Sequence, residues 1–111
     1  MYTLITALED GIHGRIPGSL GALPLIVISH DPALPWLGDA DANWEEAQDT
    51  LATASSNAVH VDTTRSSHLI PFSQPGLVVE AVREVVAAAR AADHALPRCG
   101  PAFTKLGGKC L

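Results

Sequence analysis

The sequence predicts a small α/β domain built on a parallel strand–helix–strand unit. Residues 23–29 form a short, continuous apolar run rich in β-branched side chains, which is typical of a strand buried on both faces. Residues 57–62 form a second strand candidate, and a helical pattern separates the two. Because a helical crossover connects them, we expect the two strands to be parallel and close neighbours in one sheet.

Two helices complete the predicted unit. Asn43 can cap the first helix, with Glu46 three residues later as its partner in a capping box, and apolar residues from Trp44 onward recur at helical spacing. The second helix is predicted from Pro75, which suits a first helical turn, to about Ala92. Its apolar stripe is expected to pack on the sheet and consists of Leu77, Val78, Val82, Val85, Val86 and Ala89.

The remaining segments lack a clear period. We interpret residues 1–22 as an N-terminal segment with a linker, 23–95 as the α/β region, and 96–111 as an irregular tail that mixes Gly, Pro and Lys. Two strands do not make a stable sheet, since each edge leaves unpaired backbone groups. We therefore expect further cover from N-terminal sequence absent from this chain, from a partner, or from a second copy of the chain.

Composition narrows the class of protein. The chain has 111 residues, so one modest core is expected. No apolar run reaches the roughly 20 residues of a membrane-spanning helix, and no basic flank precedes the first apolar stretch, as a secretory signal requires. A net charge of −5 disfavours binding to phosphate backbones. We expect a soluble cytoplasmic protein that binds neither nucleic acid nor membrane.

Cysteine and histidine spacing gives no sign of a metal or another cofactor. Cys99 and Cys110 do not form a Cys-x-x-Cys motif, which excludes a zinc ribbon or a thioredoxin-like site, while a disulfide in the tail is compatible with the sequence. The five histidines show no ligand spacing on a helix. We therefore expect no metal and no cofactor.

The candidate catalytic residues follow the two strands. Asp31 comes directly after the first strand, and His68 comes shortly after the second. In open parallel sheets, ligand sites form outside the carboxyl ends of the strands, so we expect one crevice to hold both side chains. In a Ser-His-Asp triad the carboxylate orients the imidazole, which takes the proton of the nucleophile. This pairing predicts Asp31 as the acid and His68 as the general base.

Three motifs in this region resemble the C-terminal end of an α/β-hydrolase-fold enzyme. Residues 31–35, DPALP, are similar to the acid loop Asp-Pro-x-x-Pro, residues 66–68, SSH, to the histidine loop, and residues 74–78, QPGLV, to the start of the final helix. The order of Asp before His also agrees with this family. The resemblance, over about residues 23–90, implies a partial α/β-hydrolase fold and hydrolysis of an ester, amide or related bond in a small-molecule substrate.

The sequence also departs from the family. Ser67 stands where Gly is usual in the histidine loop, and His30 rather than Gly precedes the acid. Some members of the fold place the acid after the preceding strand, so Glu9 or Asp10 remains an alternative. The sequence has no Gly-x-Ser-x-Gly elbow. We expect this chain alone to be inactive, with the nucleophile supplied by upstream sequence or by another chain.

A second hypothesis is a non-catalytic, hydrolase-derived interaction module that associates through its exposed sheet edge or apolar face. Simpler interpretations of the single residues also stay open. His68 can be an ordinary loop histidine, Asp31 can make an Asx turn before Pro32, and Trp44 can anchor its helix to the core. If this chain hydrolyses esters by itself, then Ser19, Ser66 and Ser67 are the serines to consider as nucleophile.

Overall fold

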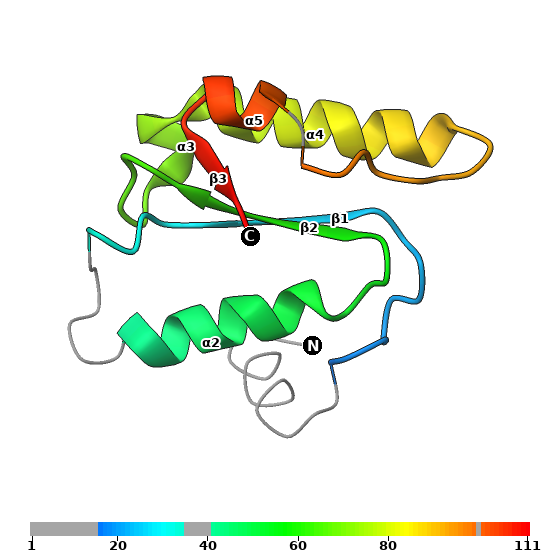
Figure 1. The fold of residues 1–111 in the computed structure, drawn as a ribbon, viewed down its shortest axis with the longest axis horizontal. Helices are drawn as coiled ribbons and strands as arrows, with labels where there is room; N and C mark the ends of the chain where they lie inside the picture. The colour runs from blue at the N-terminus through cyan, green and yellow to red at the C-terminus, as the bar shows by residue number, and fades with distance from the viewer. Residues whose placement is uncertain (1–15, 35–40, 100) are drawn as a thin grey trace.

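The protein is a small α/β domain with a three-stranded mixed sheet between helices, in a computed structural model that describes residues 16–34, 41–99 and 101–111 (Figure 1). Helix α2 lies on one side of the sheet, and α4 and α5 lie on the other. In chain order the elements are β1 (Leu25–Ser29), α2 (Asp41–Ala52), β2 (Ala58–Thr63), α3 (Ile70–Ser73), α4 (Pro75–Arg90), α5 (Pro101–Lys105) and β3 (Gly108–Cys110).

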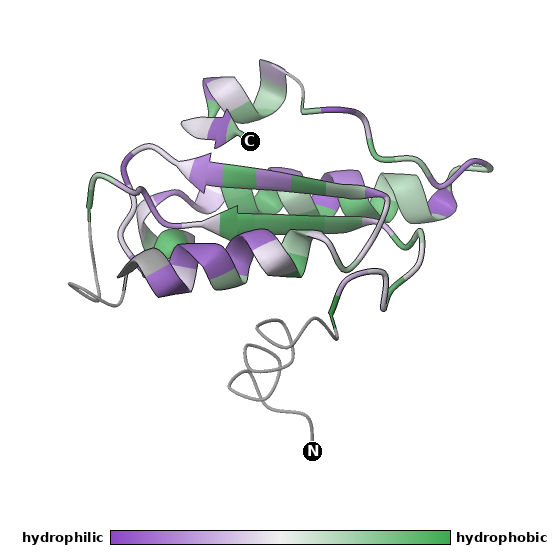
Figure 2. Ribbon diagram, turned by 60° about the horizontal axis from the view of Figure 1, so that its bottom comes forward, coloured by the Kyte–Doolittle hydropathy of each residue, from purple (hydrophilic) through white to green (hydrophobic). Residues whose placement is uncertain are grey.

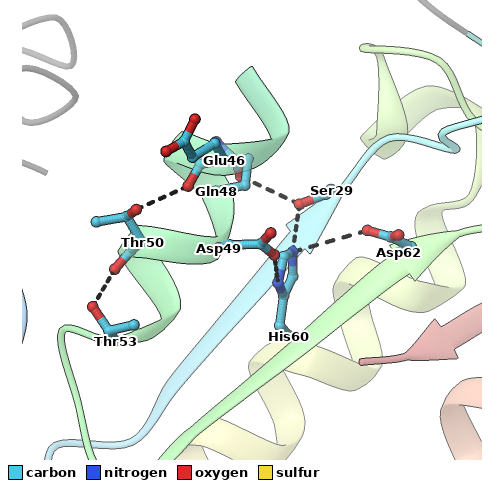
Figure 3. A network of polar contacts seen from close by, with 8 residues as sticks. All are labelled: Ser29, Glu46, Gln48, Asp49, Thr50, Thr53, His60 and Asp62. Atoms are coloured by element: carbon cyan, nitrogen blue, oxygen red, sulfur yellow. Dashed lines mark hydrogen bonds and ion pairs between the residues drawn. The ribbon is translucent and has the colours of Figure 1, made fainter. Parts of the chain in front are cut away.

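The predicted parallel strand–helix–strand unit is confirmed. β1 and β2 pair in parallel, with Leu25 opposite Ala58 and Ser29 opposite Asp62. Alternation then divides their side chains between two faces. Ile26 and Ile28 pack against the core on the α4 side, whereas Ser29 and His60 face α2 (Figure 3). The strands therefore carry an apolar face and a partly polar face.

The tail that the sequence predicts as irregular is ordered into a helix and a strand, so that prediction is wrong. β3 pairs antiparallel with β2, with Val61 opposite Cys110. A disulfide joins Cys99 to Cys110, whose Cα atoms are 5.8 Å apart, and Phe103 of α5 is only 1% exposed in the core. The tail therefore covers one of the two sheet edges that were expected to need an outside partner.

The helix boundaries agree in part with the prediction. α2 begins at Asp41, so Asn43 lies inside the helix and does not cap it. α4 begins at Pro75 as predicted and ends at Arg90, where Ala91 turns to an extended backbone. Among the described residues, no helix is long and apolar enough to cross a membrane.

The face that α4 packs on the sheet differs from the predicted stripe. Leu77, Ala81 and Ala88 are buried, while Val82 and Val86 are 58% and 40% exposed. Val82 and Val86 lie beside β1, and no strand of the described chain pairs with the outer edge of β1 to extend the sheet over them. Valines of α4 and isoleucines of β1 line an apolar groove of about 320 Å³ there. The hydropathy colours in Figure 2 show green on both strands and along α4.

Several residues named from the sequence lie outside the described part of the chain. These are Glu9 and Asp10, the alternative acids, together with the N-terminal residues up to position 15. Their predicted roles stay predictions.

Candidate functional site

The loops that follow β1 and β2 lie side by side at the carboxyl edge of the sheet. The backbone N–H of Asp31 donates to the carbonyl of Ser66, with 2.7 Å between nitrogen and oxygen. Two parallel strands end at the same edge, so this hydrogen bond directly joins the predicted acid loop to the predicted histidine loop. The structure therefore brings the two loops together. The pairing of the Asp31 and His68 side chains in one crevice stays a prediction.

The side chains of these loops have additional contacts. The Asp31 carboxylate accepts a hydrogen bond of 2.9 Å from the backbone N–H of Ala33, which is an Asx turn. His68 is exposed, and its ring meets the Trp44 indole edge to face, with ring centroids 6.1 Å apart. Trp44 of α2 thus lies beside the predicted base. The carboxylate of Asp31 is used within its own turn, whereas its backbone makes the contact to the histidine loop.

The Gln74 side chain holds the histidine loop in place through hydrogen bonds. The buried Ser66 hydroxyl donates to Gln74 Oε1 at 2.6 Å, and Gln74 Nε2 donates to the carbonyls of Leu106 and Gly107, each at 3.1 Å. Ser66 is fully buried and its hydroxyl is bonded to Gln74, so this hydroxyl serves to hold the loop. The tail residues therefore help to hold the loop that carries His68.

The other two serines considered as nucleophiles are both exposed, but they differ in position. Ser67 lies in the histidine loop itself. Ser19 lies in a turn whose neighbour Gly18 donates a backbone hydrogen bond to Thr53, just after α2 and before β2. That is the amino end of the sheet, opposite to the end that carries His68. Ser19 is therefore remote from the predicted base.

A second polar cluster, which the sequence did not reveal, lies between the sheet and α2 (Figure 3). The Ser29 hydroxyl is 2.7 Å from His60 Nε2, and His60 Nδ1 is 3.1 Å from Asp49 Oδ1. An ionised carboxylate only accepts hydrogen bonds, so Nδ1 of a neutral His60 carries the proton and Nε2 accepts from Ser29. The Ser29 side chain comes from β1, His60 from β2 and Asp49 from α2.

Carboxylates and a small hollow surround this cluster. Asp62 Oδ1 lies 3.9 Å from His60 Nε2. Burial raises the pKa of Asp62 above its ordinary value of 3.8, although His60 acts in the opposite direction, and the nearby carboxylates of Glu45 and Asp49 raise this pKa further. A hollow of about 60 Å³ lies among these side chains and Leu111. The cluster is therefore acidic and has room for a group of a few atoms.

Strand alternation is the signal that could have indicated this cluster. His60 alternates with two valines, which predicts that it faces the sheet surface or its helix cover, and it does face α2. The sequence gives no information on which residues of α2 would meet it. No group of three or more His, Cys, Asp or Glu side chains in the described part of the chain is arranged to hold a metal ion.

Comparison of the chain with protein-family models, with curated proteins and with solved structures finds no match.

Proposed function

We propose that this chain supplies the acid and the base of an α/β-hydrolase-type site, with His68 as general base and Asp31 as the residue that orients it. The observation that supports this proposal most is the hydrogen bond from the Asp31 N–H to the Ser66 carbonyl. It holds the acid loop against the histidine loop at the carboxyl edge of parallel strands, where α/β folds place their ligand sites. The motifs in residues 31–35 and 66–68 support the same roles.

The chemistry of the proposed site is hydrolysis of an ester, amide or related bond in a small molecule. His68 takes the proton of a hydroxyl nucleophile as that oxygen attacks the carbonyl carbon, and it returns the proton to the leaving group. Asp31 stabilises the imidazolium that forms in between. The nucleophile comes from further sequence or from a second chain, because this sequence has no Gly-x-Ser-x-Gly elbow.

An alcohol supplied in solution can replace the missing nucleophile and test the base. The purified chain is mixed with p-nitrophenyl butyrate and increasing ethanol, and release of nitrophenolate is followed. We expect His68→Ala to lower the alcohol-dependent rate by about 10-fold, since general bases contribute at least that much. His94→Ala, which removes another exposed histidine, serves as the matched control. Equal alcohol-dependent rates for the wild type and His68→Ala would contradict the proposal.

A second candidate function is association through the outer edge of β1 and the apolar groove beside it. The groove of about 320 Å³ is lined by Ile26, Ile28 and valines of α4, and Val79 and Val82 are 66% and 58% exposed. Exposed apolar surface beside an unpaired strand edge is typical of an interface. In this alternative the domain is a non-catalytic interaction module, and a second copy of the chain extends the sheet.

A further inference from the structure

The cluster of Ser29, His60 and Asp49 has the connectivity of a catalytic relay, and it is separate from the site proposed above. We propose that Ser29 is a nucleophile activated by His60 and oriented through Asp49, and that it takes small acyl groups from esters. The Ser29 hydroxyl lies 2.7 Å from His60 Nε2, and His60 Nδ1 lies 3.1 Å from Asp49 Oδ1. Both distances are within the hydrogen-bond range expected between a nucleophile and its base and between that base and its acid.

The hydroxyl of Ser29 has two acceptors nearby, and their distances differ. Gln48 Oε1 is 3.4 Å from the Ser29 oxygen, whereas His60 Nε2 is 2.7 Å away. The single proton of the hydroxyl therefore goes mainly to the shorter contact with His60. The Ser29 hydroxyl therefore donates to His60 Nε2, the nitrogen that would take this proton during attack.

The three side chains are held from three different elements, which fixes their geometry. Ser29 is the last residue of β1 and is only 4% exposed, and the His60 side chain is 9% exposed. His60 lies on β2, two residues before Asp62, the register partner of Ser29. Asp49 on α2 is 66% exposed, so solvent reaches the cluster from the helix side. The sheet therefore holds the nucleophile and the base in place, and the cluster is accessible to solvent on the side of α2.

Size and charge define the substrate class. The hollow of about 60 Å³ beside Ser29 and His60 accommodates an acetyl-sized group and is too small to enclose a long acyl chain. Glu45, Asp49 and Asp62 line the same hollow, so an anionic acyl group would be repelled. Short-chain esters with neutral or cationic alcohols fit both conditions.

The proposed reaction has two balanced steps. In the first, the Ser29 oxygen bonds to the acyl carbon, its proton moves to His60 Nε2, and the ester bond breaks as the leaving alcohol takes that proton. In the second, water gives a proton to His60 Nε2 and its oxygen bonds to the acyl carbon. Ser29 then leaves and regains the proton, which releases the acid. The Asp49 carboxylate stabilises the imidazolium that forms in each step.

Acetylation of the whole chain by p-nitrophenyl acetate, without added alcohol, tests the inference. We expect peptide mass spectrometry to find the acetyl group on Ser29, and Ser29→Ala and His60→Gln to lower nitrophenolate release by about 10-fold or more. Asp49→Asn is expected to lower it less, because this carboxylate is largely exposed. p-Nitrophenyl octanoate should react more slowly than the acetate.

Matched variants separate the outcomes. Ser55→Ala removes another buried serine whose hydroxyl bonds a carbonyl, and it should keep the wild-type rate. His94→Ala, at an exposed histidine outside both proposed sites, should also keep it. The assay without alcohol and the peptide map report on Ser29, so failure here and failure of the proposed general base are told apart. If Ser29→Ala does not fold, the peptide map of the folded wild type still shows whether Ser29 is acetylated. An unmodified Ser29 in the folded wild type, or equal rates for a folded Ser29→Ala, would overturn the inference.

Discussion

The Ser66 hydroxyl and Gln74 Oε1 lie 2.6 Å apart and join the histidine loop to the start of α4. Gln74 is 5% exposed, and its amide nitrogen also reaches the carbonyls of Leu106 and Gly107 in the tail. One buried side chain therefore connects a loop, a helix and the C-terminal segment. This connection explains why the order of the tail matters for the proposed site.

Loss of Gln74 should destabilise the fold. We expect Gln74→Ala to lower the free energy of unfolding by about 2–4 kcal/mol, because it removes the partner of the buried Ser66 hydroxyl and the side-chain donor to the Leu106 carbonyl. The Gly107 carbonyl keeps its hydrogen bonds from Thr64. Urea unfolding followed by circular dichroism measures this change. Ser73→Ala, at an exposed neighbour that bonds only the Leu69 carbonyl, is the control. A loss no larger than that of the control would refute the anchoring role.

The disulfide should stabilise the third strand. We expect reduction of Cys99–Cys110 to lower the free energy of unfolding by about 3 kcal/mol, because the bond closes a loop that includes α5 and leads to β3. Urea unfolding with and without dithiothreitol measures this difference. In the double variant Cys99→Ser/Cys110→Ser the reductant should have no effect. Equal stability of the wild type in both conditions would contradict the prediction.

The same two cysteines test the cellular location. Cytoplasmic location stays a prediction from the sequence, and it predicts reduced thiols in the cell. Disulfides persist mainly in oxidising compartments. Alkylation of free thiols during cell lysis, followed by mass spectrometry of the tail peptide, reports the state in vivo. Fully alkylated Cys99 and Cys110 would support a cytoplasmic location, and a protected pair would favour an oxidising compartment.

The raised pKa of Asp62 predicts how stability depends on pH. A folded-state pKa above the ordinary 3.8 means that the folded protein binds the proton more tightly than the unfolded chain. The associated stability is present below pH 3.8 and is lost as pH rises through the folded-state pKa. Asp62→Asn should therefore gain stability relative to the wild type as pH rises. Thermal melts across this range measure it, with Asp93→Asn, at an exposed position, as control. A constant difference between Asp62→Asn and the wild type at all pH values would count against the assignment.

Association through the apolar groove can be measured directly. If a second copy covers β1 and α4, size-exclusion chromatography with light scattering should show a dimer that dissociates on dilution. Val82→Asp should weaken it by about 10-fold or more, because it places a charge in the interface. Val79→Thr, a milder change at an exposed position nearby, is the comparison. A wild-type monomer at all concentrations would exclude this function.

The sequence predicted the elements whose signals are local. The apolar run of β1, the strand at β2 and the start of α4 at Pro75 were all predicted correctly. Their hydrophobic patterns and the Gly and Pro residues near their ends mark them directly in the sequence. β3 has three residues and no period of its own. It forms because it pairs with β2 and is tied by a disulfide, and a single sequence does not show such long-range contacts.

The candidate sites show the same division. The meeting of the Asp31 and Ser66 loops follows from parallel topology, and topology was predictable. The contact of Ser29 with His60 depends on strand register, and the contact of His60 with Asp49 depends on the rotation of α2. The exposure of Val82 depends on which strand lies at the edge. None of these quantities is encoded in hydrophobic periodicity alone.

The central claim, that Asp31 acts as the acid for His68, is tested most directly by Asp31→Asn in the alcohol-dependent ester assay. Asparagine keeps the side-chain oxygen that accepts from Ala33, so the turn is retained while the charge is removed. The account predicts that Asp31→Asn lowers the rate by about 10-fold and adds little to His68→Ala, since the two act as one unit. A wild-type rate in a folded Asp31→Asn variant would show that Asp31 is only a turn residue.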